Sequence, residues 1–269
     1  MTWIAITRAV SSAIVHCELT HLDRRPIDLM AARAQHRAYE EALRALGCEV
    51  RSLPADLALP DAVFVEDTAV VCDELAVITR PGAPSRRAEI VATAVALRPH
   101  RPLMRIAPPG SMDGGDVLRV GRTVYVGLSG RTNRAAIDQL TAGLSPHGYV
   151  VRAVPVHGCL HLKSAVTQVA ADTVLCNPRW VDPAAFAPLH VVEVDDAEPY
   201  AANGLLIDGR VMYPTTFPAT RRRLEGRGIA VALVDVSELQ KAEGAVTCCS
   251  LVFEAAPHSL PAGAGMLQQ

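Results

Sequence analysis

A thiol, an imidazole and two carboxylates recur at nearly regular intervals along the chain. Asp67, Asp113, His161, Asn203 and Cys248 each lie in a short segment of small and polar residues, and consecutive members are 42 to 48 residues apart. A thiolate is an effective nucleophile once a neighbouring donor or positive charge lowers its pKa, and a histidine can move the proton. Two carboxylates beside them would hold a planar cation such as a guanidinium group. The residue types therefore indicate cysteine chemistry on a cationic substrate.

Each of these residues also has a purely structural interpretation. Cys248 and Cys249 lie in a strand-like run, where they would point to opposite faces and could both pack, and His161 could be a hydrogen-bonded core histidine. The nearby acids could lie in solvated turns: Glu66, Asp67, Asp113 and Asp116. The regular spacing favours the chemical interpretation, because four polar groups around one axis are costly to bury without a purpose.

The elements that must position these residues form a repeated unit, in which each polar segment lies between two strand-like runs. The runs before the polar segments are CEVRSLP, RPLMRIAP, GYVVRAVPV, LHVVEV and GIAVALVDV. The return strands are LAVITRPG, TVYVGLSG, DTVLCNP and RVMYPT, and the N-terminal WIAITRA has the composition of the fifth. A period of about 40–50 residues indicates a repeated supersecondary unit. We therefore predict a closed α/β ring in one domain over residues 1–254, with a flexible tail at 255–269; a doubly wound α/β sheet is the alternative.

Helical segments separate the repeated units. The segment from Asp28 to Gly47 has an N-capping residue, a terminal glycine and apolar residues at helical spacing, namely Met30, Ala34, Ala38, Leu43 and Leu46. Ser85 and Asn133 can cap two further helices, and a short helix is expected after Pro218. The glycines of the segment MDGGD predict a tight backbone turn that aims Asp113 or Asp116.

Composition and charge exclude several classes of protein. The 269 residues are 50% apolar and 20% charged, and a net charge of −2 gives no basic surface for nucleic acid or an anionic membrane. No apolar run could span a bilayer, and the start lacks the pattern of a secretory signal, so we expect a cytoplasmic protein. Seven scattered cysteines without a CxxC pair argue against a disulfide framework and a structural zinc site. P-loop, dinucleotide-binding and HExxH motifs are absent from the sequence.

Two arginines could bind the other end of a substrate. Arg86 in PSRRAE and Arg131 in SGRTN each follow a return strand and lie near the expected start of a helix. If both reach the same mouth as the acids, they would grip the carboxylate of a substrate whose other end is a cation. Considered alone, each is typical of a solvated surface arginine.

With these residues in place, the sequence resembles the dimethylarginine dimethylaminohydrolase family of the guanidino-group-modifying pentein superfamily. The matching stretches, in order, are LPDAVFVEDTAVV, ITRPGAPSRR, MDGGDVL, VGLSGRTN, LHLKS, AAN and TCCS, and they extend from about Leu19 to Phe253. The resemblance implies a five-bladed α/β propeller (pentein) built from a pseudo-fivefold repeat of ββαβ-type units. It also implies hydrolysis of asymmetric dimethylarginine and monomethylarginine to citrulline and an alkylamine through a covalent thiouronium on cysteine, without metal or organic cofactor.

The resemblance also implies a role for each matching residue. Cys248, the first cysteine of TCCS, is similar to the nucleophile, His161 of LHLKS to the proton donor, and Asp113 to the acid that accompanies them, where some relatives carry Glu. The residues that would bind substrate are Glu66 and Asp67 at the guanidinium end, Asp61, Arg86 and Arg131 at the amino-acid end, and backbone groups of Leu19 and Ala242. The expected partner is a small molecule, with no nucleic acid and no membrane; monomer and homodimer both stay open.

Two other functions fit the same residues. Hydrolysis of unmethylated arginine to citrulline and ammonia would use the same machinery, although arginine deiminases usually carry a helical insertion that does not interrupt the repeats here. Agmatine-type substrates lack the carboxylate that Arg86 and Arg131 would bind. A non-catalytic module could instead capture guanidino compounds, or a thiophilic metal at Cys248, Cys249 and His161.

Overall fold

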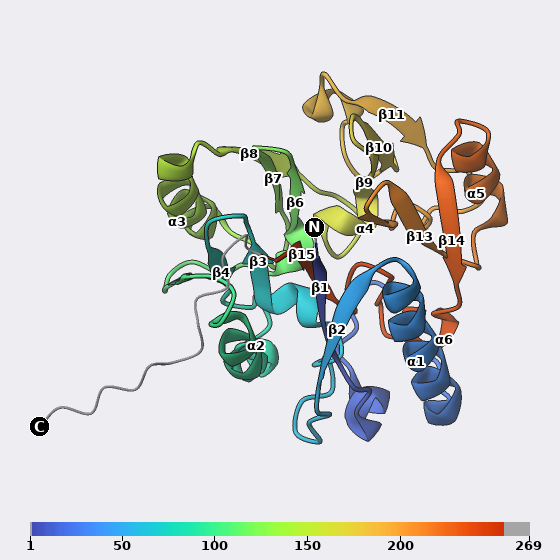
Figure 1. The fold of residues 1–269 in the computed structure, drawn as a ribbon, viewed down its shortest axis with the longest axis horizontal. Coiled ribbons are helices and arrows are strands. Elements are labelled where there is room, and N and C mark those ends of the chain that lie inside the picture. The colour runs from blue at the N-terminus through green and yellow to red at the C-terminus, as the bar shows by residue number, and fades with distance from the viewer. Residues whose placement is uncertain (1, 256–269) are drawn as a thin grey trace, which may run out of the picture.

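Five three-stranded sheets surround a central axis, one for each predicted unit (Figure 1). The structure is a computed structural model that describes residues 2–255. In every sheet the middle strand pairs antiparallel with one neighbour and parallel with the other. The sheets are β15 (Leu251–Glu254), β1 (Trp3–Arg8) and β2 (Cys48–Leu53); β3 (Ala69–Val71), β4 (Ala76–Ile78) and β5 (Leu103–Arg105); β6 (Val117–Val120), β7 (Thr123–Leu128) and β8 (Val150–Pro155); β9 (Val166–Ala170), β10 (Thr173–Cys176) and β11 (His190–Glu193); β12 (Leu205–Ile207), β13 (Arg210–Pro214) and β14 (Ala230–Val234).

The N-terminal strand closes the ring. β1 pairs antiparallel with β15, so that Trp3 lies opposite Glu254, and it pairs parallel with β2 from Cys48 onward. The fifth sheet therefore joins the two ends of the described chain, as predicted from WIAITRA. The predicted ring of five α/β units is confirmed, and the doubly wound sheet is wrong because each unit keeps its own sheet.

Each parallel connection passes through a helical segment on the outside of the ring. These segments are α1 (Leu29–Ala45), η3 (Pro84–Glu89) with α2 (Ile90–Leu97), α3 (Arg134–Leu144), η6 (Pro183–Phe186) and α5 (Pro218–Glu225). The remaining helical turns are η1 (Ser12–His16), η2 (Val65–Thr68), η4 (Gly114–Asp116), η5 (Ser145–His147), α4 (Leu162–Ala165) and α6 (Ser237–Gln240). Asn133 caps α3 as predicted, whereas Ser85 caps no helix and donates a hydrogen bond to Glu18.

The apolar core is divided among five clusters, each between two neighbouring sheets. Successive side chains of a strand point to opposite faces, so each middle strand contributes to two clusters. The pairs on the middle strands are Ala5 and Ile6, Val77 and Ile78, Tyr125 and Val126, Val174 and Leu175, and Val211 and Met212. This packing holds the five sheets in a closed ring.

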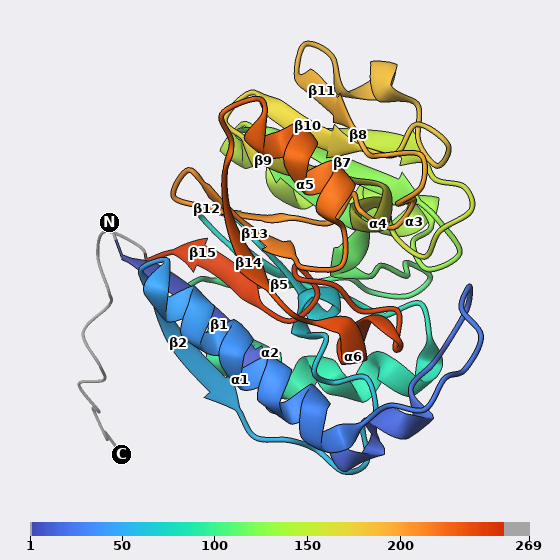
Figure 2. The same cartoon turned by 90° about the vertical axis from the view of Figure 1, so that its right-hand side faces the viewer.

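Helix α1 has the predicted limits but buries a different face. Asp28 caps it through the N–H groups of Met30 and Ala31, and Gly47 follows its end with φ +91°. The buried residues are Ala32, His36, Tyr39 and Leu43, which recur at helical spacing, whereas Met30 is 76% exposed. The predicted stripe is wrong, except for Leu43 and Leu46, because the polar side chains of His36 and Tyr39 pack inward. Figure 2 shows α1 lying alongside β1 and β2.

No helix within residues 2–255 is long and apolar enough to cross a membrane. The predicted tail at 255–269 lies outside the described residues from residue 256 onward. The assignment of residues 1–254 to one domain stays a prediction, which the pairing of β1 with β15 supports.

Candidate active site

The five periodic residues occupy equivalent positions in the five units. Asp67 in η2, Asp113 before η4, His161 before α4, Asn203 before β12 and Cys248 before β15 each precede the first strand of their sheet. His161 Nε2 lies 3.0 Å from Asp113 Oδ2, and the Asn203 amide donates to Thr247 Oγ1, next to Cys248. The structure therefore brings these positions together around the axis, as the spacing predicts.

The imidazole of His161 lies between two buried carboxylates. Its Nε2 is 3.0 Å from Asp113 Oδ2, and its Nδ1 is 3.8 Å from Asp67 Oδ1. Burial alone would lower the pKa of His161, but Asp67, Asp113 and Asp116 outweigh it and raise that pKa to about 9. Burial would raise the pKa of Asp67, yet His161 and Arg86 bring it down to about 2. The neighbouring carboxylates therefore keep the imidazole protonated at neutral pH.

Asp116 has a structural role beside this pair. Its Oδ2 accepts hydrogen bonds from the hydroxyls of Ser129 and Thr132, and its Oδ1 accepts from Leu162 N. It thus fixes the backbone immediately after His161, which leaves Asp113 as the acid that contacts the imidazole.

The glycines of MDGGD are needed for close packing. A Cβ on Gly114 would lie 2.0 Å from Glu66 O, and one on Gly115 would lie 2.6 Å from His161 Nδ1 and 2.7 Å from Asp67 Oδ1. Gly115 N also donates to Asp67 Oδ1 at 2.9 Å. The predicted turn exists as η4, but the close approach of His161 and Asp67 is what excludes a side chain.

Cys248 lies in a turn between α6 and β15, not in the strand that the sequence predicts. Its carbonyl accepts a hydrogen bond from Glu66 N, and its side chain is partly exposed, whereas Cys249 is fully buried in the core and donates to Ala245 O. Burial, Glu66 and Asp67 raise the pKa of Cys248 to about 12. These surroundings therefore keep the thiol of Cys248 neutral, and a bound cation would be needed to favour the thiolate.

A cavity of about 20 Å³ lies at the centre of the site. Seven of the ten predicted site residues line it: Asp61, Asp67, Arg86, Arg131, His161, Ala242 and Cys248. Asp113 lies behind His161, and Leu19 lies on the loop beside Glu18, which does line the cavity. This volume holds about one water molecule, so a larger ligand requires the walls to move.

Arg86 is not at the mouth, where the sequence analysis placed it. Its guanidinium is buried, with Nη1 2.5 Å from Asp67 Oδ2 and Nη2 2.8 Å from Glu89 Oε2. Nη2 also donates to the carbonyls of Asp61 and Phe64. Arg86 therefore reaches the cavity as part of its wall, where two buried acids hold it, and its binding of a substrate carboxylate stays a prediction.

Removing Arg86 should therefore destabilise the protein as well as weaken binding. Arg86→Ala leaves Asp67 and Glu89 buried without their partner, and breaking such a pair costs about 3–5 kcal/mol. We expect a clearly lower melting temperature by calorimetry, together with a higher KM. Arg87→Ala is the matched control, since within residues 2–255 the side chain of Arg87 donates only to Pro81 O; equal melting temperatures for both variants would contradict the assignment.

Arg131 reaches the cavity from the side of an N-terminal loop. Its Nη1 lies 3.8 Å from Asp113 Oδ2, and its Nη2 donates to Thr20 Oγ1 at 3.1 Å. On the same loop, Glu18 N donates to both carboxylate oxygens of Asp61. Arg131 and Asp61 therefore lie where the loop carrying Leu19 covers the site.

Glu243 also holds this loop, although the sequence analysis did not identify it. Its carboxylate accepts hydrogen bonds from three consecutive N–H groups, those of Thr20, His21 and Leu22. Its backbone has φ +58°, a conformation that non-glycine residues rarely adopt. The contact joins residues more than 220 positions apart, so only its place beside Ala242 in the sequence pointed to it.

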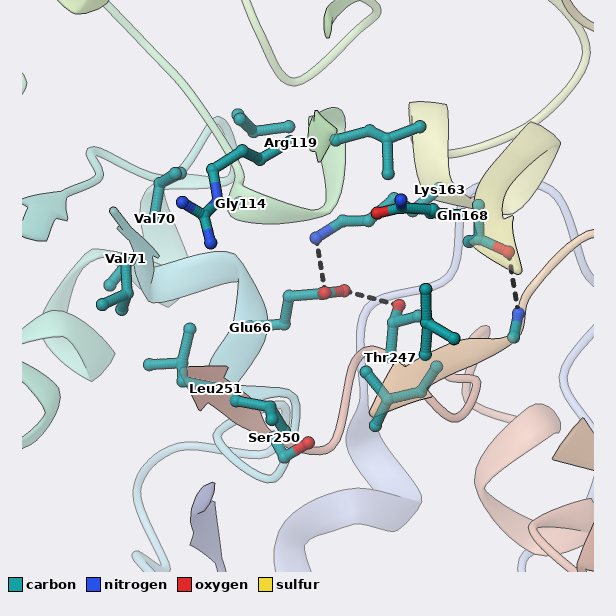
Figure 3. A pocket seen from close by; sticks show the side chains of 18 of the residues that line it. Glu66, Val70, Val71, Gly114, Arg119, Lys163, Gln168, Thr247, Ser250 and Leu251 are labelled. Atoms are coloured by element: carbon teal, nitrogen blue, oxygen red, sulfur yellow. Dashed lines mark hydrogen bonds and ion pairs between the residues drawn. The ribbon is translucent and has the colours of Figure 1, made fainter. Parts of the chain in front are cut away.

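Glu66 faces a different pocket from the one that contains Cys248. Its carboxylate accepts hydrogen bonds from Lys163 Nζ and Thr247 Oγ1 (Figure 3). This second pocket has a volume of about 360 Å³, and Cys248 is not among its lining residues. The structure therefore does not place Glu66 in contact with the cavity, contrary to the prediction that it binds substrate beside Asp67.

Among residues 2–255, one group of side chains brings potential metal ligands within 4.8 Å of one another: Asp67, Asp113 and His161. The Arg86 guanidinium already pairs with Asp67, so a metal ion would be placed beside a fixed positive charge. We therefore infer that Asp67 and Asp113 hold the imidazole of His161 in place.

Several known proteins are similar to this chain in sequence. The family model described as arginine deiminase matches residues 57–208. The N(G),N(G)-dimethylarginine dimethylaminohydrolase of Streptomyces coelicolor is 41% identical over 92% of this chain and 95% of its own. The enzyme of that name from Pseudomonas aeruginosa is 37% identical over 84% of this chain and 90% of its own.

Solved structures show the same relationship. A cysteine-to-serine mutant of the Pseudomonas aeruginosa enzyme, complexed with citrulline, superimposes with a TM-score of 0.89 at 34% identity, over 94% of this chain and all of that one. The N-terminal domain of the cyanobacterial arginine dihydrolase ArgZ, at 16% identity over 93% of this chain and 97% of that one, shares the fold with a TM-score of 0.80. The five sheets are thus the blades of a five-bladed α/β propeller, and the chain belongs to the dimethylarginine dimethylaminohydrolase family.

Proposed function

We propose that the protein hydrolyses asymmetric dimethylarginine and monomethylarginine to citrulline and dimethylamine or methylamine. One observation carries the proposal: Cys248 shares a small cavity with His161, whose imidazole two carboxylates keep protonated. The relatives named for this reaction match nearly the whole chain, which supports the same substrate class.

Substrate binding requires an exchange of partners in the cavity. Asp67 now holds the guanidinium of Arg86, the same chemical group that the substrate would bring. When the substrate guanidinium takes its place on Asp67, Nη1 of Arg86 becomes available to join Arg131 on the substrate carboxylate, while Nη2 stays bound to Glu89. Asp61 binds the α-amino group, and backbone groups of Leu19 and Ala242 flank the chain of the substrate.

The first half of the reaction breaks the bond to the alkylamine. The bound cation lowers the pKa of Cys248, the thiol loses its proton to solvent, and the thiolate attacks the central carbon of the guanidinium. His161, which the carboxylates keep protonated, donates its proton to the nitrogen that leaves, while Asp113 and Asp67 hold the imidazole in place. The alkylamine departs, and a thiouronium remains covalently attached to Cys248.

The second half returns the enzyme to its starting state. The neutral imidazole of His161 takes a proton from a water molecule that attacks the thiouronium carbon. The carbon–sulfur bond of the tetrahedral adduct then breaks, and the hydroxyl proton of the adduct passes to the departing Cys248 thiolate as the carbonyl of citrulline forms. Citrulline leaves, with His161 protonated and Cys248 neutral again. We propose no metal or organic cofactor for these steps, and activity should therefore survive EDTA. The cytoplasmic location and the oligomeric state stay predictions from the sequence.

Hydrolysis of unmethylated arginine to citrulline and ammonia is the second candidate, because the matching family model is that of arginine deiminase. The two functions differ in the product amine. Asymmetric dimethylarginine, monomethylarginine, arginine and agmatine should be compared at equal concentration, with citrulline or its decarboxylated analogue and the released amine both measured. We expect the highest kcat/KM for the methylated arginines; a higher value for arginine would reject the proposal in favour of the deiminase.

A further inference from the structure

A larger pocket adjoins the cavity that contains Cys248. It has a volume of about 580 Å³, within the range of typical small-molecule sites, whereas the cavity has about 20 Å³. Much of its lining is apolar or aromatic: Leu22, Cys159, Tyr200, Phe217 and Ala245. Leu160, Glu243 and Gly244 line both spaces, so these three residues form the wall between them.

Leu160 is the member of this wall whose side chain could be shortened without disturbing the site. Glu243 is held by the loop N–H groups of Thr20, His21 and Leu22. Gly244 has no side chain, and a Cβ there would lie 2.1 Å from the Phe64 ring. Leu160 is half-buried and presents an apolar side chain to the cavity.

The position of Leu160 in the chain places it at the leaving-group end of the substrate. In the mechanism above, the departing nitrogen must lie within hydrogen-bond distance of His161, the next residue. The methyl carbons are one bond beyond that nitrogen, in a cavity with room for about one water molecule. Most of the other side chains that line the cavity are charged, including Asp61, Asp67 and Arg131. Phe64 is also apolar, but Leu160 is the large apolar residue next to His161 in the chain, so the methyl groups are best accommodated against Leu160.

Resting on the proposed function, we infer that Leu160 sets the size limit for the nitrogen substituent. The pocket beyond it is a latent subsite for larger apolar groups, such as propyl or benzyl, on the departing amine. Tyr200 and Phe217 give that subsite aromatic surface, which suits a benzyl group. Leu160→Ala should open the cavity into this pocket.

The test compares asymmetric dimethylarginine with Nω-benzylarginine in the wild type and in Leu160→Ala. A hydrophobic wall discriminates by about 10–200-fold per methylene, so the ratio of kcat/KM for the benzyl to the dimethyl substrate should rise at least about 10-fold. Leu206→Ala is the matched control, because Leu206 lines the pocket of Glu66 and not the cavity; its ratio should equal that of the wild type. In Leu160→Ala, adding Tyr200→Ala should raise KM for the benzyl substrate and leave its kcat unchanged.

Two results would overturn the inference. One is an unchanged ratio in Leu160→Ala, and the other is a wild-type enzyme that already accepts the benzyl substrate as well as the dimethyl one. Leu160→Val gives a smaller opening and should give an intermediate ratio, which keeps the test decisive if the alanine variant folds poorly. Failure of the proposed function is a separate outcome, because the wild type would then release no citrulline from methylated arginines.

Discussion

Cys248→Ser should lower citrulline formation on the order of 10⁴-fold or more, with an unchanged melting temperature. A serine hydroxyl remains protonated where the thiol can be converted to a thiolate, so the attack on the guanidinium carbon is lost. The fold should persist because backbone contacts hold the turn: Cys248 O accepts from Glu66 N, and Thr247 N donates to Asn203 Oδ1. Steady-state citrulline release and thermal unfolding measure the two effects.

Cys249→Ser is the matched control for this variant. Cys249 is fully buried in the core between the β1 and β13 sheets, so a hydroxyl there should lower stability and leave the activity of the folded enzyme largely intact. Near-normal turnover by Cys248→Ser would overturn the assignment of the nucleophile.

His161→Gln should lower kcat by about 10²–10⁴-fold, because the departing amine loses its proton donor. The NH2 group of the glutamine amide can still donate hydrogen bonds to the carboxylates of Asp67 or Asp113, but the amide has no acidic proton to transfer to the amine. A substrate analogue with a good leaving group needs no protonation, so it should lose much less activity in this variant than dimethylarginine does. An equal loss for both substrates would contradict the role of proton donor.

The dependence of kcat/KM on pH gives an independent test of the protonation state of His161. Burial and the neighbouring acids raise the pKa of Cys248 to about 12, and the carboxylates raise that of His161 to about 9. When the enzyme loses one proton, that proton therefore comes mostly from His161, and the form with a Cys248 thiolate and a protonated His161 is the minor one. We therefore expect kcat/KM to rise with pH and level off near pH 9. Asp113→Asn removes an acid that raises the pKa of His161, so its profile should level off at lower pH. Ionisation of the substrate affects the profiles of the wild type and of Asp113→Asn equally, so a difference between them reports on the enzyme. Identical profiles would contradict the effect of Asp113 on the pKa of His161.

The arrangement of the ring could be predicted because it depends on local patterns that repeat. Each unit has the same order of turn and strands, so the residues before β3, β6, β9, β12 and β15 must occupy equivalent places. The N-terminal strand was assigned to the fifth sheet because that unit lacked a return strand. Asn133 was identified as a cap from its neighbours in sequence alone.

Side-chain directions within the site depended on contacts between distant segments. Arg86 is in the cavity wall because Asp67 and Glu89 hold it, and Glu66 turns to Lys163 across the units. The buried face of α1 follows the hydrogen bonds of Tyr39 to Val246 O and Ser250 Oγ, which no helical periodicity reveals. These contacts form when the ring closes and brings distant segments together. The spacing of residue types therefore predicts which residues lie near one another, but not the direction in which each side chain points.

The most direct test of the central claim is the mass of the enzyme quenched with acid during turnover of asymmetric dimethylarginine. We predict a species heavier than the free protein by the substrate minus dimethylamine, with the added mass on the peptide that contains Cys248 and absent from Cys248→Ser. Unmodified protein throughout turnover at saturating substrate, or an adduct on Cys249, would contradict catalysis through a thiouronium on Cys248.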